Sequence, residues 1–114
     1  MQAMEAASAL AQAIRESEEY REYERLKKEI DEDAGILSLV NEYKRLQTHM
    51  QMRMLSGQGL EEEEAGRFQS LNMLLFADGR TSGYLMAEMR LQKMLADIFG
   101  VLTRAAGMEI PLPV

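Results

Sequence analysis

A long stretch near the C-terminus constrains the fold of this chain more than any other part of its sequence. It runs from Tyr84 to Ala106, and no proline interrupts it. Its apolar residues recur every three or four positions, which places them on one face of an α-helix. These residues are Tyr84, Ala87, Leu91, Met94, Leu95, Ile98, Leu102 and Ala105. We expect this stripe to be core, because burial of each large apolar side chain contributes about 1.5 to 3 kcal/mol.

A second set of apolar residues widens the apolar side of this helix. At about 100° per residue the set lies beside the first stripe, so that the apolar arc covers roughly two-thirds of the circumference. The set comprises Leu85, Met89, Ala96 and Phe99. An arc this wide needs neighbours on at least two sides. The pattern therefore predicts a helical interaction protein, although it names no biological process.

The first 30 residues predict helical structure with one interruption. An alanine-rich amphipathic pattern begins at Met4 and ends near Arg15, and its small side chains suit close contact with another helix. Ser17 is a candidate cap for a renewed start. A cap signal fits one kinked helix as well as two separate helices. We favour the kink.

The middle of the chain predicts two more helices. Asp33 is a plausible N-cap for a helix over residues 34–55. Two glycines then end this helix, and the glutamates at 61–64 favour the positive end of a new helix that continues to about Ala77. Three residues of the next turn are candidate caps for the final helix: Asp78, Thr81 and Ser82.

These segments together predict an all-α fold. Short loops between helices favour antiparallel neighbours, so we expect an elongated antiparallel helical bundle of about four to five helices with a long C-terminal helix. At 114 residues the chain fits one domain. We expect that domain over residues 1–107, followed by an irregular C-terminal tail over residues 108–114.

Charge and composition exclude several classes of function. The formal net charge of -6 disfavours direct binding to nucleic acid or to anionic membranes, since both reward clustered Lys and Arg. The absence of cysteine excludes disulfides and any metal or iron–sulfur site built on thiolates. No signal-peptide pattern and no membrane-spanning run is present. We therefore expect a cytoplasmic protein.

No set of residues converges on a catalytic, cofactor or metal site. His49 is the only histidine, and Leu46 stands where a di-iron bundle site needs a glutamate. We expect His49 at the surface or rim. Gly57 and Gly59 lack the spacing of a phosphate-binding loop. The chain is therefore not expected to be an enzyme, and we expect no cofactor and no metal.

Four residues of the final helix are candidates for a protein-interaction surface. They are Leu85, Met86, Met89 and Phe99. Methionine is soft and conformable, and it recurs on surfaces that accept helices. The alternative for these methionines is the filling of the core.

Glu88 is a candidate buried polar residue, because it falls inside the apolar arc, where an unpaired charge is costly. One hypothesis is an ion pair or hydrogen bonds with Arg45, Arg53 or a tyrosine, within the chain or across subunits. The alternative is a rim position with access to water.

Several segments resemble the YlbF/YmcA family of small helical bacterial regulators. They are ALAQAIRESEEYREYERLKKEI, LVNEYKRLQ, GQGLEEEE and YLMAEMRLQKMLADI. The likeness covers roughly Met4 to Gly107, and its most specific parts are ESEEY at 16–20 and the stretch from Tyr84 to Ile98. A YheA-like family has a similar helical pattern.

The resemblance implies a cytoplasmic, non-enzymatic protein that oligomerises and joins YlbF-, YmcA- and YaaT-type partners. In the family this complex assists RNase Y in mRNA processing, and so affects competence, biofilm formation and sporulation. Some members supply cysteines to an iron–sulfur cluster, but this chain has none. The alternative function is that of a stand-alone homo-oligomeric helical protein, YheA-like, with a structural or chaperone-like binding role.

Overall fold

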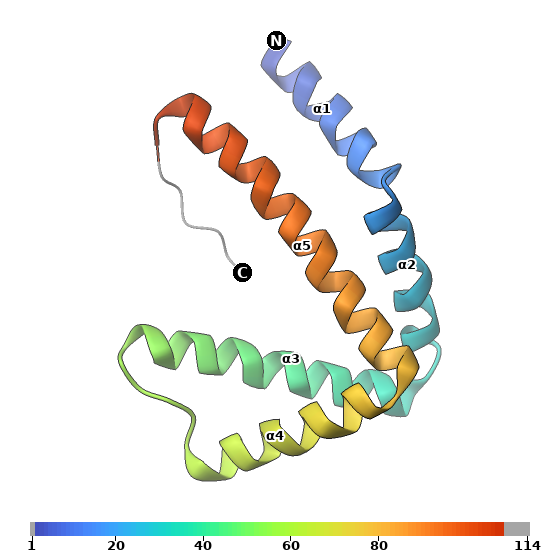
Figure 1. Ribbon diagram of the computed structural model, residues 1–114, viewed down its shortest axis with the longest axis vertical. Helices are drawn as coiled ribbons and strands as arrows, with labels where there is room; N and C mark the ends of the chain where they lie inside the picture. The colour runs from blue at the N-terminus through green and yellow to red at the C-terminus, as the bar shows by residue number, and fades with distance from the viewer. Residues whose placement is uncertain (1, 109–114) are drawn as a thin grey trace. The chain divides into compact units, whose positions relative to one another are not determined.

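The protein is all-helical in its structure, a computed structural model that describes residues 2–108 (Figure 1). Its helices are α1 (Gln2–Arg15), α2 (Glu18–Asp31), α3 (Ala34–Leu55), α4 (Glu62–Ala77) and α5 (Gly79–Ala106). No strand occurs within residues 2–108. The prediction of an all-α fold with a long C-terminal helix is confirmed, and α5 is the longest helix at 28 residues.

The chain divides into two compact units. The first unit comprises Met1–Leu26 and Leu85–Val114, and the second comprises Lys27–Tyr84. Both α2 and α5 therefore contribute residues to each unit. The single-domain organisation over residues 1–107 stays a prediction. Of the predicted irregular tail, Met108 lies outside the helix and is exposed, whereas residues 109–114 lie outside the described part of the chain.

Ser17 separates α1 from α2. Its hydroxyl donates to the carbonyl oxygen of Ile14 at 2.6 Å and accepts a hydrogen bond from the backbone N–H of Tyr20 at 3.2 Å. It therefore closes one helix and caps the next. The prediction of one kinked helix is wrong, because Glu16 and Ser17 are both non-helical and leave two separate helices.

The boundaries of α3 follow from local capping. Asp33 has extended backbone and accepts the N–H of Ile36 at 3.1 Å, which confirms the predicted N-cap. At the other end Gly57 adopts a φ of 79°, a left-handed conformation that glycine reaches without steric cost. The glutamates that follow do lie in the first turn of α4, where negative charge is favoured.

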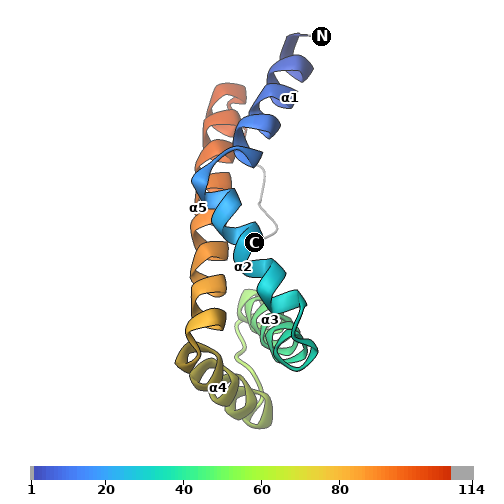
Figure 2. The same cartoon turned by 90° about the vertical axis from the view of Figure 1, so that its right-hand side faces the viewer.

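The core of the second unit lies between α3 and α4, which form an antiparallel hairpin (Figures 1 and 2). Val40, Leu46, Leu71 and Leu75 are each no more than 2% exposed. The ring of Tyr43 stacks on Phe68 with the centroids 5.0 Å apart, and its hydroxyl donates to Oδ1 of Asn72 at 3.0 Å. Burial raises the pKa of Tyr43, which keeps this donor protonated.

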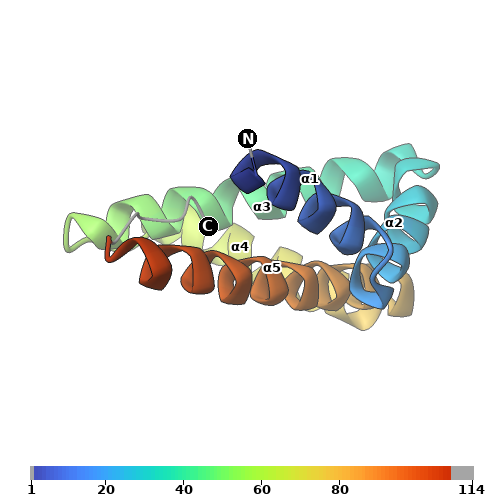
Figure 3. The same ribbon diagram turned by 90° about the horizontal axis from the view of Figure 1, so that it is seen from above.

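The first unit is packed less tightly. No residue of α1 is buried, and α1 runs apart from the second half of α5 in both Figure 1 and Figure 3. An ion pair of 3.5 Å between Arg90 on α5 and Glu22 on α2 belongs to this unit. The predicted close contact of the alanine-rich helix with another helix therefore buries none of the described residues of α1, although Leu10, Ala11 and Ile14 are half-buried.

Candidate interaction surface

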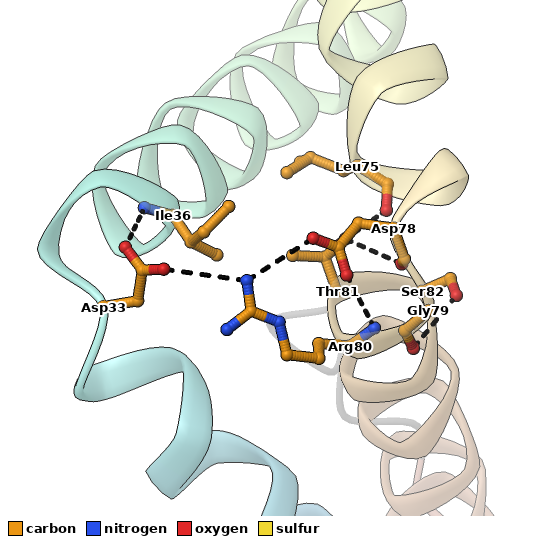
Figure 4. Close-up of polar contacts among 8 residues, drawn as sticks. All are labelled: Asp33, Ile36, Leu75, Asp78, Gly79, Arg80, Thr81 and Ser82. Carbon is orange, nitrogen blue, oxygen red and sulfur yellow. Dashed lines mark hydrogen bonds and ion pairs between the residues drawn. The ribbon is translucent and has the colours of Figure 1, made fainter.

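The first turn of α5 is held by a polar junction in the second unit (Figure 4). Asp78 accepts the backbone N–H of Arg80 at 2.8 Å. The Arg80 guanidinium then lies 3.5 Å from the Asp78 carboxylate and 3.6 Å from that of Asp33. One cation thus joins the caps of α3 and α5.

Two further contacts fix the same turn. The hydroxyl of Thr81 is fully buried and donates to the carbonyl oxygen of Leu75 in α4. Lys44 of α3 donates to the hydroxyl of Tyr84 at 2.5 Å, and its ammonium lies 4.7 Å from the centre of that ring. The start of α5 is therefore part of the hairpin unit.

The electrostatics of the junction follow from these contacts. The hydrogen bond from the Arg80 N–H is the main cause that lowers the pKa of Asp78, and the Arg80 side chain adds to it. On the outside of the hairpin, hydrogen bonds from Arg67 at 2.6 and 2.8 Å lower the pKa of Glu42 in the same way. Both carboxylates are thus held in the ionised form.

The stripe predicted as core is covered in its first half alone. Tyr84 and Ala87 are buried, and Leu91 is 9% exposed. Beyond that point Leu95 is 42% exposed and Leu102 is 53% exposed. The prediction of a continuous core stripe is therefore wrong from Leu95 onward in the single chain. The cover is incomplete here, because α1, the helix of the same unit, has no buried residue and Met94, Ile98 and Phe99 of α5 are only half-buried.

The four predicted interaction residues have different environments. Met86 is 52% exposed and Met89 is 64% exposed, whereas Phe99 is half-buried. Leu85 is 5% exposed and so is buried within its own chain. The structure therefore leaves two of the four, Met86 and Met89, open to a partner.

These exposed residues form two separate faces of α5. At about 100° per residue, Met86 and Met89 lie roughly opposite the stripe, so the expectation that Met89 lies beside the stripe is wrong. We call Met86 and Met89 the methionine face, and Leu95, Ile98 and Leu102 the leucine face. Lys93 and Asp97, paired at 3.0 Å, lie on the side of the methionine face.

The polar residues singled out in the sequence do not gather into a chemical site. Nε2 of His49 is 3.4 Å from a Glu64 carboxylate oxygen at the surface of the hairpin. Glu88 is half-buried on α5, and its role stays a prediction. Arg53, one of the partners considered for it, donates to the carbonyl oxygen of Gly59 at 2.5 Å. Among residues 2–108 no three His, Cys, Asp or Glu side chains are placed to hold a metal ion.

Comparison with known proteins identifies the family. The sequence profile described as "Control of competence regulator ComK, YlbF/YmcA" matches residues 3–105. The chain belongs to the YlbF/YmcA family. The resemblance noted in the sequence is thereby confirmed.

Relatives and solved structures agree with this assignment. The chain is 28% identical over 105 residues to UPF0342 protein STH1710 of Symbiobacterium thermophilum, which covers 92% of this chain and 94% of that protein. It shares the fold of a protein of unknown function (DUF964) from Bacillus stearothermophilus, with a TM-score of 0.75, 16% identity and 94% coverage of both chains. It also shares the fold of Bacillus subtilis RicA, solved in complex with RicF, with a TM-score of 0.61, 16% identity, and coverage of 93% of this chain and 94% of that chain.

The sequence reasoning missed the leucine face as a surface of this YlbF/YmcA protein. Apolar periodicity identifies which residues avoid water, but it does not say which molecule covers them. One signal was available, since six of the 14 residues of α1 are alanine and its large apolar side chains are Met4, Leu10 and Ile14. None of the helices within residues 2–108 has the length and apolar content needed to cross a membrane.

Proposed function

We propose that this YlbF/YmcA protein is a non-enzymatic adaptor that acts through protein–protein contacts in a complex modulating RNase Y-dependent mRNA processing. The main support for the proposal is the methionine face. The large apolar side chains of Met86 and Met89 are exposed on α5, and a hydrogen bond to Asp78 holds the first turn of this helix. Family membership and the fold shared with RicA, itself solved with RicF, support it.

The chemistry of the methionine face suits a helical partner. Methionine side chains are unbranched and polarisable, so they adapt to the shape of an incoming apolar surface. Lys93 and Asp97 border the face and supply one charge of each sign at its rim. We expect the partner to be a protein of the YlbF, YmcA or YaaT type that packs an apolar helix face on Met86 and Met89, beside the Lys93–Asp97 pair.

A pull-down from native bacterial cytoplasm tests the proposal with a matched pair of variants. Met89→Glu and Met52→Glu introduce the same charge at side chains of equal exposure, 64% and 65%. The expected result is that wild type and Met52→Glu recover YlbF-, YmcA- or YaaT-type proteins and RNase Y, whereas Met89→Glu loses them. Wild type that recovers none of these proteins, or two variants that behave alike, would contradict the proposal.

A stand-alone homo-oligomer with a structural or chaperone-like role is the second candidate. The leucine face favours it, because Leu95 and Leu102 remain exposed on the side of α5 opposite the methionine face. In that case wild type assembles with itself but recovers no family partner and no RNase Y from cytoplasm. The same pull-down therefore separates the two candidates.

A further inference from the structure

We propose that an apolar groove of the second unit binds a basic amphipathic helix of a partner protein. The groove has a volume of about 410 Å³ and lies where α3, α4 and the start of α5 meet. The inference goes beyond the proposed function, because it uses neither the methionine face nor a partner of the YlbF, YmcA or YaaT type. Either proposal can therefore fail without the other.

The lining of the groove is mainly apolar. Ile36 and Leu39 of α3 are half-buried, and Leu74 of α4 is 54% exposed. Leu75 and Thr81 also line the groove and are no more than 1% exposed, so they form its floor. The Thr81 hydroxyl already donates to the Leu75 carbonyl oxygen and needs no polar partner from outside. The groove therefore suits apolar side chains of a ligand.

Contacts within the chain hold the walls of the groove in place. The Asp33 carboxylate caps α3 by accepting the N–H of Ile36 at 3.1 Å. Arg80 lies 3.6 Å from Asp33 and 3.5 Å from Asp78, and so joins the start of α3 to the start of α5 (Figure 4). A groove that is formed before binding loses little conformational freedom when a ligand enters it.

Acidic side chains flank one end of the groove. Asp78 lines the groove, and its ion pair with Arg80 connects the groove to a second hollow, which Glu29, Glu32, Asp33 and Arg80 line. Four carboxylates, those of Glu29, Glu32, Asp33 and Asp78, thus share this region with one guanidinium. The hydrogen bond from the Arg80 N–H lowers the pKa of Asp78, which keeps that carboxylate ionised. The flank therefore carries a net negative charge.

The negative flank selects a basic occupant. It attracts Lys and Arg side chains, whereas it repels nucleic acid and anionic membranes. A second copy of this chain carries a net charge of -6 and is disfavoured for the same reason. The groove is too open to enclose a small molecule, since Leu74 stays 54% exposed. An amphipathic helix instead places apolar side chains in the groove and its basic side chains against the flank.

Isothermal titration calorimetry with synthetic peptides tests the proposal. The probe is a peptide of leucine and lysine with its leucines at helical spacing, and the control peptide has glutamate in place of lysine. Wild type should bind the leucine–lysine peptide, and should bind the leucine–glutamate peptide about tenfold more weakly or less, because the flank repels it. No binding of the leucine–lysine peptide, or equal affinity for the two peptides, would overturn the inference.

A matched pair of variants in α4 tests whether the groove is the binding site. Leu74→Gln and Met73→Gln each replace an exposed apolar side chain and change no charge, but only Leu74 of the two lines the groove. Leu74→Gln should weaken binding of the leucine–lysine peptide about tenfold, as the loss of a central apolar contact does, whereas Met73→Gln should bind like wild type. Circular dichroism checks that both variants are folded. Equal affinities of the two folded variants would contradict the proposed site.

A second pair of variants tests the acidic flank. Glu32→Lys and Glu63→Lys change the net charge by the same amount, but Glu63 lies in the first turn of α4, about 16 Å along the helix from Leu74. Glu32→Lys should weaken peptide binding about two- to fivefold, and Glu63→Lys should weaken it less. Equal weakening would mean that the overall charge of the protein attracts the peptide, and would refute the role of the flank.

Methyl NMR identifies the occupant directly. The methyl signals of Ile36 and Leu39 should shift when the leucine–lysine peptide is added, in wild type and in Met73→Gln alike. Signals that shift with protein concentration, and not with the peptide, would show that a second copy occupies the groove and would overturn the inference.

Discussion

The α3–α4 hairpin and the second half of α5 have the same kind of apolar periodicity, yet their side chains have different environments. In the hairpin Leu71 and Leu75 are each 1% exposed, whereas Leu95 and Leu102 on α5 are about half exposed. The difference lies in the neighbours, because α3 and α4 cover each other and α1 has no buried residue. Apolar spacing therefore marks a surface that avoids water, and the available neighbours decide whether it becomes core or interface.

The largest expected effect tests this contrast directly. Leu75→Ala should lower the free energy of unfolding by about 2 to 5 kcal/mol, because it opens a cavity in a closed core. Leu102→Ala should cost less than about 1 kcal/mol, because this side chain is 53% exposed in the single chain. Urea unfolding at low protein concentration measures both. Equal losses of stability would show that Leu102 is as well covered as Leu75, and would contradict the difference between the hairpin and the second half of α5.

The second effect concerns the polar junction of the hairpin unit. Thr81→Val keeps the shape of the side chain but removes the buried hydroxyl that donates to the Leu75 carbonyl. The free energy of unfolding should fall by about 1 to 3 kcal/mol, because a buried acceptor loses its partner. Thr103→Val is the control, since the Thr103 hydroxyl is only half-buried and donates to the Gly100 carbonyl oxygen within α5 itself. Thermal unfolding of the two variants measures both losses of stability. A loss for Thr103→Val as large as that for Thr81→Val would contradict the difference in burial between the hairpin unit and the second half of α5.

A smaller effect on folding is expected at the centre of the leucine face. The sequence alone predicts that Leu95→Asp unfolds the chain, whereas its 42% exposure indicates that the monomer tolerates the change. We now expect circular dichroism close to that of wild type and a loss of assembly in light scattering. Collapse of helicity in Leu95→Asp would restore the view of this stripe as intramolecular core.

The smallest effect is the pH dependence of the junction. The pKa of Asp78 is lower in the folded protein than in the unfolded chain, so its ionised form favours folding. This contribution is present above the unfolded pKa and is lost as the pH falls through the folded pKa. Asp78→Asn should therefore flatten the acid side of the stability profile, measured by urea unfolding in a series of acidic buffers. A stability profile identical to that of wild type would show that the ionised Asp78 carboxylate contributes nothing to the free energy of unfolding.

Much of the fold was predictable because its causes are local. The Asp33 cap, the glycine turn after α3 and the glutamates at the start of α4 each act over a few residues. The break at Ser17 was harder, since one hydroxyl both ends α1 and caps α2. The interaction surface stays a prediction: of its four residues, the structure leaves Met86 and Met89 exposed and buries Leu85.

The sequence by itself determined the family, the apolar stripe of α5 and the helices α3 to α5, because these depend on spacing and capping along the chain. The tertiary structure alone decided where that stripe passes from core to surface, between Leu91 and Leu95. It also placed Arg80 between Asp33 and Asp78, residues far apart in the sequence. The physical reason is that burial is a property of neighbours in space, and one helix cannot encode which helices will cover it.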